Sequence, residues 1–282
     1  MAISFNSKGV ASMKFNGKNV SEAWLNGSKV WPNATSIEPL ISDISRDLNI
    51  MPIHFSEFNG DLEQPLITLQ TSFGRPRPWA SEPSNPTFGP GCCGRKALYF
   101  GGSQSSVIQL HSAAKVKDLI TISALVRTNT LSTYGGFIGG TIFGLVTQGF
   151  GYAIGWGRNI QNNKICAEVY SDGNVAAACY SNTAMNPSRW YHIMAKCCVN
   201  YLISGSVYAC TNVNGEGWKR ASTYPGENID YSNTDAIYLG RVLQSGTNYL
   251  TGFIQDFVLW PIDVPEAQLA RIIQYYQENG VY

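Results

Sequence analysis

The chain has 282 residues, enough for one large or two modest domains; 44% are hydrophobic, 14% are charged, and the net charge is +1. This near-neutral charge without any Lys/Arg run argues against nucleic acid as a partner, and no window reaches the ~18 apolar residues of a membrane span. The 28 glycines and the 12% aromatic content are typical of an all-β protein.

A ten-residue repeat occupies the N-terminal segment 1–32. Phe5–Val10 is followed by Phe15–Val20 and Leu25–Val30, each an apolar residue, Asn, a small residue, two variable positions and Val. Asn-Gly is the strongest short hairpin signal, so we expect a small β-meander with three tight turns. Thirty residues bury little apolar surface alone. The unit is therefore either a hairpin tucked onto the main domain or an anchor for assembly through Phe5, Phe15, Trp24, Leu25 and Trp31.

Segment 33–95 is expected to lead into the main domain. Asn33–Ser36 has linker composition, and the spacing of Leu40, Ile41, Ile44 and Leu48 predicts a short helix over Ile37–Leu48. Residues 65–90 are rich in Pro, Gly and Ser and indicate an irregular surface segment.

From Lys96 onward, the pattern predicts an antiparallel β-sandwich over 96–282. Ile120, Ile122, Ala124 and Val126 alternate along one predicted strand. The full set of predicted strands is 97–100, 106–110, 119–127, 152–156, 165–170, 175–180, 190–196, 206–212, 236–242 and 252–260.

A single helix closes the predicted sandwich. Asp263 is the expected N-cap, with Glu266 three residues later as in a capping box and Pro265 in the first turn. Gly280 ends the helix, which is expected to cover an edge or an end of the sandwich.

The seven cysteines are expected to be reduced. Cys92-Cys93 and Cys197-Cys198 are adjacent pairs, and neighbours on a strand face opposite sides. If Tyr170 pairs with Val175 across the 171–174 turn, Cys166 lies opposite Cys179, the one pair close enough to oxidise. No zinc-type spacing occurs.

Four segments, in order, resemble the laminin G-like, concanavalin A-like jelly rolls. They are Arg95–Gly102 ("ALxF-G"), Thr121–Arg127 ("TIS-A-W-V-R", with Leu125 in place of Trp), Ser188–Ile193 ("W-Y-H") and Leu250–Trp260 with its following helix. The resemblance covers about two-thirds of the chain and implies a lectin-like antiparallel jelly-roll sandwich with one C-terminal helix.

The segment Ser21–Pro32 and the preceding Asn-Gly-Lys repeats resemble N-terminal segments of virion proteins from crAss-like phages of gut Bacteroidales. This resemblance implies a segment that fastens a fibre or decoration protein to a particle. The start of the chain shows no signal-peptide pattern, so we expect synthesis in the host bacterial cytoplasm and a final location in the virion.

The sequence argues against a glycosidase. A retaining enzyme needs two carboxylates ~5–5.5 Å apart, which on a jelly-roll strand means acids at i and i+4. No E-x-D-x-E motif occurs, and Asp61/Glu63 is expected to be a solvated turn. Glu168 has no acid at i±2, and its one acid at i±4, Asp172, falls in the predicted 171–174 turn and not on the strand. The jelly-roll resemblance implies a structural role for His192. We therefore expect no enzyme.

Binding residues are sought in loops, where an aromatic ring stacks on a sugar and amides fix its hydroxyls. The candidate carbohydrate-binding residues are Tyr134, Trp218, Tyr224, Tyr249, Asn214 and Asn248. Asp230, Asn233 and Asp235 have oxygens suited to Ca²⁺, but an ordinary polar turn explains their loop better than a calcium site does.

These observations favour a non-enzymatic, homo-oligomeric phage virion protein, either a head fibre or a capsid decoration protein. Its partners would be other virion proteins, through the N-terminal element, and host surface glycans, through the sandwich. A tail fibre or receptor-binding protein, a free carbohydrate-binding lectin and a polysaccharide-degrading enzyme are the alternatives.

Overall fold

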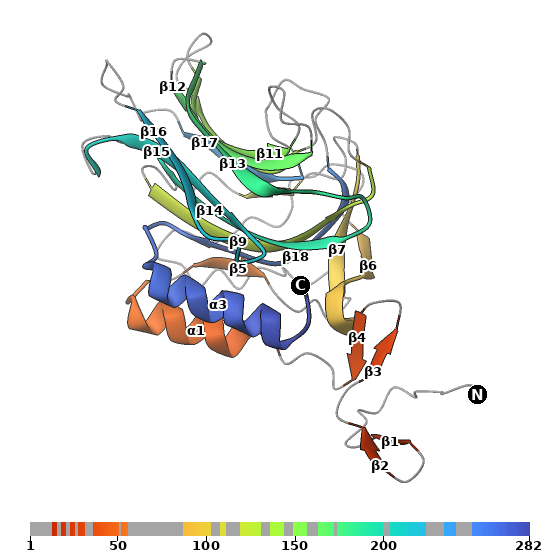
Figure 1. Cartoon of the computed structure of the whole chain (residues 1–282). Coiled ribbons are helices and arrows are strands. Elements are labelled where there is room, and N and C mark those ends of the chain that lie inside the picture. The colour runs from red at the N-terminus through yellow and green to blue at the C-terminus, as the bar shows by residue number, and fades with distance from the viewer. Residues whose placement is uncertain are drawn as a thin grey trace.

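The computed structural model contains two packed sheets, two helices on one side of them, and two small hairpins towards the N-terminus (Figure 1). It describes residues 13–15, 18–20, 23–25, 28–31, 36–50, 52–55, 87–102, 108–110, 119–130, 136–143, 149–156, 163–171, 174–199, 204–223, 234–240 and 250–282. Of the predicted irregular segment, only its last residues are among these, and they form a strand, β6.

The N-terminal repeats form hairpins, as expected, but not a continuous meander. Strands β1 (Met13–Phe15) and β2 (Lys18–Val20) pair with Phe15 opposite Lys18, with two residues of sequence between them. Strands β3 (Ala23–Leu25) and β4 (Ser28–Trp31) repeat this arrangement in a separate two-stranded sheet. The first repeat, which contains Phe5, lies outside the described residues.

Eight strands form the larger sheet, in the order β16–β15–β14–β9–β18–β7–β6, and β5 also pairs with β18. Their bounds are β5 Ile53–Phe55, β6 Thr87–Pro90, β7 Lys96–Gly101, β9 Leu119–Thr128, β14 Trp190–Cys198, β15 Val207–Val213, β16 Lys219–Thr223 and β18 Thr251–Trp260. Strands β5 and β6 precede Lys96, so segment 33–95 contributes to this sheet.

The smaller sheet has six strands in the order β13–β12–β11–β10–β17–β8. Their bounds are β8 Ile108–Leu110, β10 Gly136–Phe143, β11 Gly149–Trp156, β12 Lys164–Ser171, β13 Asn174–Ala184 and β17 Thr234–Leu239. Neighbouring strands in both sheets are antiparallel. The predicted antiparallel sandwich is therefore confirmed.

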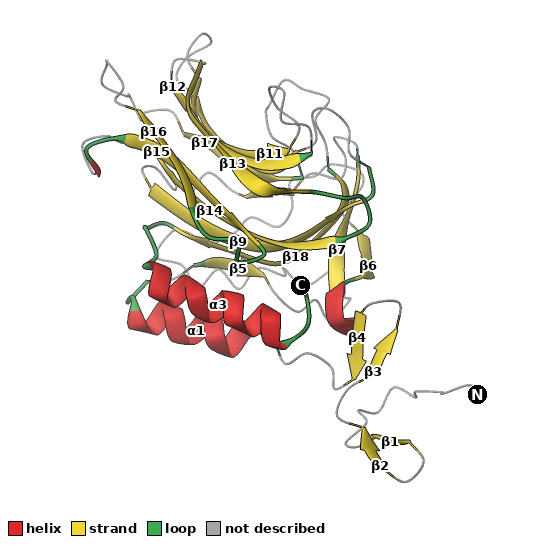
Figure 2. Cartoon of the chain, viewed as in Figure 1, coloured by secondary structure: helices red, strands yellow, loops and turns green. Residues whose placement is uncertain are grey.

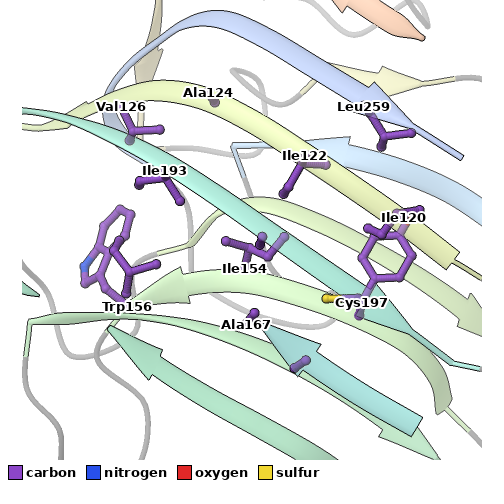
Figure 3. Packing of buried hydrophobic residues seen from close by; sticks show 14 of the residues in the cluster. Ile120, Ile122, Ala124, Val126, Ile154, Trp156, Ala167, Ile193, Cys197 and Leu259 are labelled. Atoms are coloured by element: carbon purple, nitrogen blue, oxygen red, sulfur yellow. The ribbon is translucent and has the colours of Figure 1, made fainter. Parts of the chain in front are cut away.

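The main core lies between the two sheets. The predicted alternation along β9 is confirmed, because Ile120, Ile122, Ala124 and Val126 are all buried in this core. Figure 3 shows Ile122 of β9 near Ile154 of β11, from the opposite sheet. Burying one such side chain contributes about 1.5–3 kcal/mol, so the strand is fixed in register by its inner face.

A third layer of two helices packs on the outer face of the eight-stranded sheet, the face turned away from the six-stranded sheet (Figure 2). Helix α1 (Glu38–Asp47) matches the predicted short helix, and helix α3 (Glu266–Glu278) matches the predicted C-terminal one. The helices cover a sheet face, whereas an edge or end was expected. The reason is that this face is also apolar; the buried side chains shared by helices and sheet include Ile41, Ile44, Leu125, Met194, Val258, Leu269 and Ile272.

The predicted capping box at the start of α3 is wrong. The N-cap position is Pro265, without a side-chain cap. The Asp263 carboxylate instead accepts from Lys196 Nζ at 2.5 Å and from the Tyr208 hydroxyl at 2.9 Å. The predicted end is confirmed: Gly280 follows the helix with φ 65°, the left-handed conformation that glycine adopts without strain.

A β-bulge changes the predicted pairing of two cysteines. Tyr170 does pair with Val175, but the register shifts between Val169 and Tyr170, so Cys166 lies opposite Tyr180 and not opposite Cys179. Neither of these two cysteines is in a disulfide.

The two adjacent cysteine pairs differ from each other. Cys197 and Cys198 point to opposite faces of β14, as predicted. Cys92 and Cys93 are on a turn, η1 (Cys92–Gly94), and not on a strand; Cys93 has φ 56°, and the two Sγ atoms lie 3.3 Å apart. The strand argument therefore fails for this pair, although both thiols are free.

Thiol titration tests whether the seven cysteines are reduced. All seven cysteines are buried and free, and a buried thiol reacts slowly because only the exposed thiolate is a good nucleophile. We expect the native protein, prepared without reductant, to show almost no reaction with an aromatic disulfide reagent, and the unfolded protein to show seven equivalents. Five equivalents after unfolding would mean that one disulfide had formed.

One edge of the six-stranded sheet is covered by a side chain. The Glu216 carboxylate accepts hydrogen bonds from the Asn182 and Thr183 amides of β13, at 2.9 and 2.8 Å. It also accepts one from the Thr183 hydroxyl, at 2.7 Å. These amides lie in the outermost strand, where its pairing with β12 is irregular, and the carboxylate supplies acceptors for them near the end of that strand.

Candidate carbohydrate-binding surface

The outer face of the eight-stranded sheet continues beyond the helix layer at both ends. Helices α1 and α3 cover Leu125 and Met194, in the middle of β9 and β14. Arg127 and Trp190 lie towards one end of these strands, and Lys196 lies towards the other. Each end presents aromatic and charged side chains together, so each end is a candidate surface for binding a sugar.

Four side chains form a row across the first end, which we name the Arg127 row: Tyr99, Phe253, Arg127 and Trp190. The sheet register makes them direct neighbours on β7, β18, β9 and β14. The Arg127 Cζ atom lies 4.3 Å from the Phe253 ring centroid and 5.4 Å from that of Trp190. The Tyr99 and Phe253 centroids are 5.0 Å apart. Phe253 is 7% exposed, and the other three are half-buried.

A bulge in β18 explains how the row shares a face with the helix contacts. Asp256 has φ 53°, and the pairing with β9 shifts between Gln255 and Val258. Before the bulge Phe253 faces outward, and after it Val258 does. Simple alternation would turn Val258 inward, so without the extra residue only the row or the helix contacts could form.

The Arg127 guanidinium has an unusual electrostatic environment. Among the described residues no carboxylate pairs with it, and its Nε is buried without a hydrogen bond to any of them. Burial lowers the pKa of Arg127, because the rings remove water without supplying a negative charge. At Arg95 burial also opposes the charge, but the Asp256 carboxylate at 2.6 Å outweighs it and raises the pKa.

The second end contains Trp218, one of the predicted sugar-stacking residues. Its half-buried ring lies 5.1 Å from Lys196 Nζ, which is also bonded to Asp263. The Arg220 Cζ atom lies 4.2 Å above the Tyr208 ring. Lys196 beside Trp218 thus has a carboxylate partner, whereas Arg127 has none among the described residues.

Asn214 has a structural role in addition to the binding role predicted for it. Its φ is 51°, its side-chain oxygen accepts from the His192 amide at 2.9 Å, and its own amide donates to the His192 carbonyl at 2.8 Å. Asn214 therefore fixes the turn that leads from β15 towards Trp218.

The side chains of the other predicted sugar-binding and calcium-binding residues lie outside the described part of the structure. Asp235 falls within strand β17, where only its backbone is described. The others lie outside the described residues: Tyr134, Tyr224, Asp230, Asn233, Asn248 and Tyr249. No cluster of three or more His, Cys, Asp or Glu side chains suited to a metal occurs in the described part of the chain. The calcium site therefore stays a prediction.

The Arg127 row was missed in the sequence because binding residues were sought in loops alone. A signal existed: Arg127 is an outward position in the alternation of β9, and Trp190 and Phe253 lie within two of the segments that resemble jelly-roll strands. The sequence does not show the strand register that makes Arg127, Trp190 and Phe253 neighbours.

A buried histidine pairs with a serine, but on the evidence of burial this is a structural contact. His192 Nε2 lies 2.9 Å from Ser123 Oγ, and Nδ1 lies 3.2 Å from the Tyr282 hydroxyl. Ser123 is 1% exposed and His192 0%. A substrate cannot reach the serine beneath α3, so the pair serves to hold the C-terminal residue on the sheet.

Glu168 is the one fully buried carboxylate of the described part of the six-stranded sheet. It lies on the face away from the core and accepts a hydrogen bond from Tyr170. The residues paired with it on the adjacent strands are Ala153 and Ala178. These neighbouring positions hold no second carboxylate of the kind a glycosidase requires.

Helices of the described residues are too short or too polar to cross a membrane. No protein-family model matches the chain, and no curated protein sequence matches it significantly.

Several solved structures share the fold. Domain 4 of AbnA, an extracellular GH43 arabinanase from Geobacillus stearothermophilus solved with arabinotriose, is 16% identical with a TM-score of 0.55, over 79% of this chain and 97% of that one. The receptor-binding domain of botulinum neurotoxin type G is 14% identical with a TM-score of 0.51, over 79% of this chain and 50% of that one. The chain therefore spans half of the toxin domain. These similarities establish a lectin-like β-sandwich.

Proposed function

We propose that this chain is a non-enzymatic virion structural protein of a phage, a head fibre or capsid decoration protein whose lectin-like sandwich binds host surface glycans. The observation that carries the glycan-binding part is the Arg127 row. Sugar rings stack on aromatic faces, and a planar guanidinium donates hydrogen bonds to sugar oxygens. A sandwich of the same fold, in the arabinanase, is known with an oligosaccharide.

The two N-terminal hairpins support the anchoring part of the proposal. Each has only two strands, and an isolated two-stranded hairpin is at best marginally stable in water. Strand β4 lies beside η1, at the edge of the sandwich (Figure 1). Such elements gain stability from a partner surface, and the resemblance of the repeat to virion proteins makes other virion proteins and sister chains the expected partners.

An N-terminal deletion tests the anchor. We expect a chain that starts at Ala34 to keep its β-type circular dichroism spectrum and its cooperative unfolding, since strands β5 to β18 and both helices remain. It should lose self-association in light scattering and lose binding to particles depleted of the protein. A shortened chain that assembles and binds like the full chain would remove the anchoring role and favour a free lectin.

Adsorption assays test the attachment role separately. Particles that lack the protein should adsorb to host cells more slowly, since many weak sites on one particle act together. Unchanged adsorption would leave decoration as the role of the protein.

A further inference from the structure

The charges of the described arginines indicate which of them is available to a ligand. Arg95 pairs with Asp256, Arg46 with Asp43, and Arg271 with Asp47. Arg127, Arg189 and Arg220 contact aromatic rings instead, and none of the three has a carboxylate partner among the described residues. Arg189 and Arg220 are exposed to water, whereas Arg127 is half-buried between its rings. A half-buried guanidinium without a counter-ion gains most from an anion supplied from outside.

The rings around Arg127 give the site a shape. Phe253, almost completely buried, lies against the guanidinium on one side, and the half-buried Trp190 lies on the other. Tyr99 and Trp190 are at opposite ends of the row, three strand intervals apart, or about 14 Å at the usual strand spacing. Stacking surfaces therefore flank a central positive charge.

We propose that the Arg127 row selects glycans bearing an anionic substituent, with the guanidinium binding the anion and the flanking rings stacking on sugar faces. The ligand class includes uronic and sialic acids, which carry carboxylates, and sulfated sugars. The inference rests on the proposed glycan-binding function and narrows its ligand. Because the guanidinium is planar and held between rings, it presents two parallel N–H groups to an oxyanion, which a lysine does not.

A glycan array with matched pairs tests the proposal on the full-length protein. The acidic probes are oligogalacturonate, sialyllactose and sulfated lactosamine; their neutral counterparts are methyl-esterified oligogalacturonate, lactose and lactosamine. We expect at least one acidic probe to bind about tenfold or more tightly than its neutral partner, as for the gain of a charge-assisted hydrogen bond.

Three variants locate the preference. Arg127→Gln should reduce binding to the acidic probe by about 10- to 100-fold and binding to the neutral one by clearly less, because a neutral sugar loses hydrogen bonds but no charge pairing. Arg127→Lys should lose part of the affinity, since the charge stays but the paired N–H groups do not. The matched control is Arg220→Gln, which removes an arginine that also stacks on a ring of the same sheet face, at the opposite end.

The outcomes separate the inference from the function on which it rests. Equal binding of neutral and acidic probes, or an acidic preference that survives Arg127→Gln in a protein with an unchanged melting temperature, would overturn the inference and leave glycan binding intact. Binding to no probe on the array, together with unchanged adsorption of particles lacking the protein, would overturn the glycan-binding function itself.

Discussion

Asp256→Asn is expected to lower the free energy of unfolding by about 3–5 kcal/mol, the cost of leaving a buried charge without its partner. The two Asp256 oxygens accept from Arg95 at 2.9 and 2.6 Å, and the Tyr276 hydroxyl donates to the second at 3.2 Å. The Asp256 side chain is 1% exposed and that of Arg95 is 9% exposed, so water cannot solvate the guanidinium in place of the lost carboxylate. Asparagine tolerates the positive φ at this position, so the change isolates the charge.

Urea denaturation of the variant and the parent measures this loss. The control is Asp43→Asn, which breaks the ion pair of Asp43 with Arg46 at 2.7 Å. Those side chains are 44% and 74% exposed, and a surface pair contributes at most about 1 kcal/mol. Equal losses for the two variants would show that the Arg95–Asp256 pair is not what holds the β18 bulge against η1 and α3.

Acid is expected to destabilise the protein through His192. Burial holds the pKa of His192 at about 3, far below its ordinary value of 6.5. Below pH 6.5 His192 therefore binds a proton in the unfolded chain but stays neutral in the folded chain. Stability from this group is complete above pH 6.5 and is lost as the pH falls towards 3, with about 2 kcal/mol gone at pH 5.

Unfolding free energies measured by urea between pH 7 and pH 5 test this dependence. His192→Phe should be less stable at neutral pH, because Ser123 and Tyr282 lose their partner, but its stability should fall about 2 kcal/mol less over that range. Parallel pH curves for the two proteins would mean that folding does not lower the pKa of His192.

Most of the sandwich could be predicted from the sequence because its strands carry one-sided alternation or strong apolar runs. The exceptions have physical reasons. Strand β10 (Gly136–Phe143) is rich in glycine, and β16 (Lys219–Thr223) is a polar edge strand, so neither shows the usual pattern. Strand β5 is three residues long and forms by pairing with β18, which is distant in sequence.

The candidate site was less accessible from the sequence than the fold. The bulge at Asp256 decides which side chains of β18 face outward, and a second bulge beside Tyr170 decides the partner of Cys166. Both shift the register by one residue, which moves side chains to the other face or to another neighbour. Sequence patterns fix the inward positions well because burial selects them, but they do not specify which strands become neighbours.

The Glu216 contact with β13 has a consequence for a protein present in many copies. An unpaired outer strand can pair edge to edge with a strand of a neighbouring molecule, which leads to aggregation. A carboxylate bonded to two amides of β13 makes such pairing unfavourable near the end of the strand, since an incoming chain would have to displace a charged group. We therefore expect Glu216 to disfavour aggregation through this strand when the protein is concentrated.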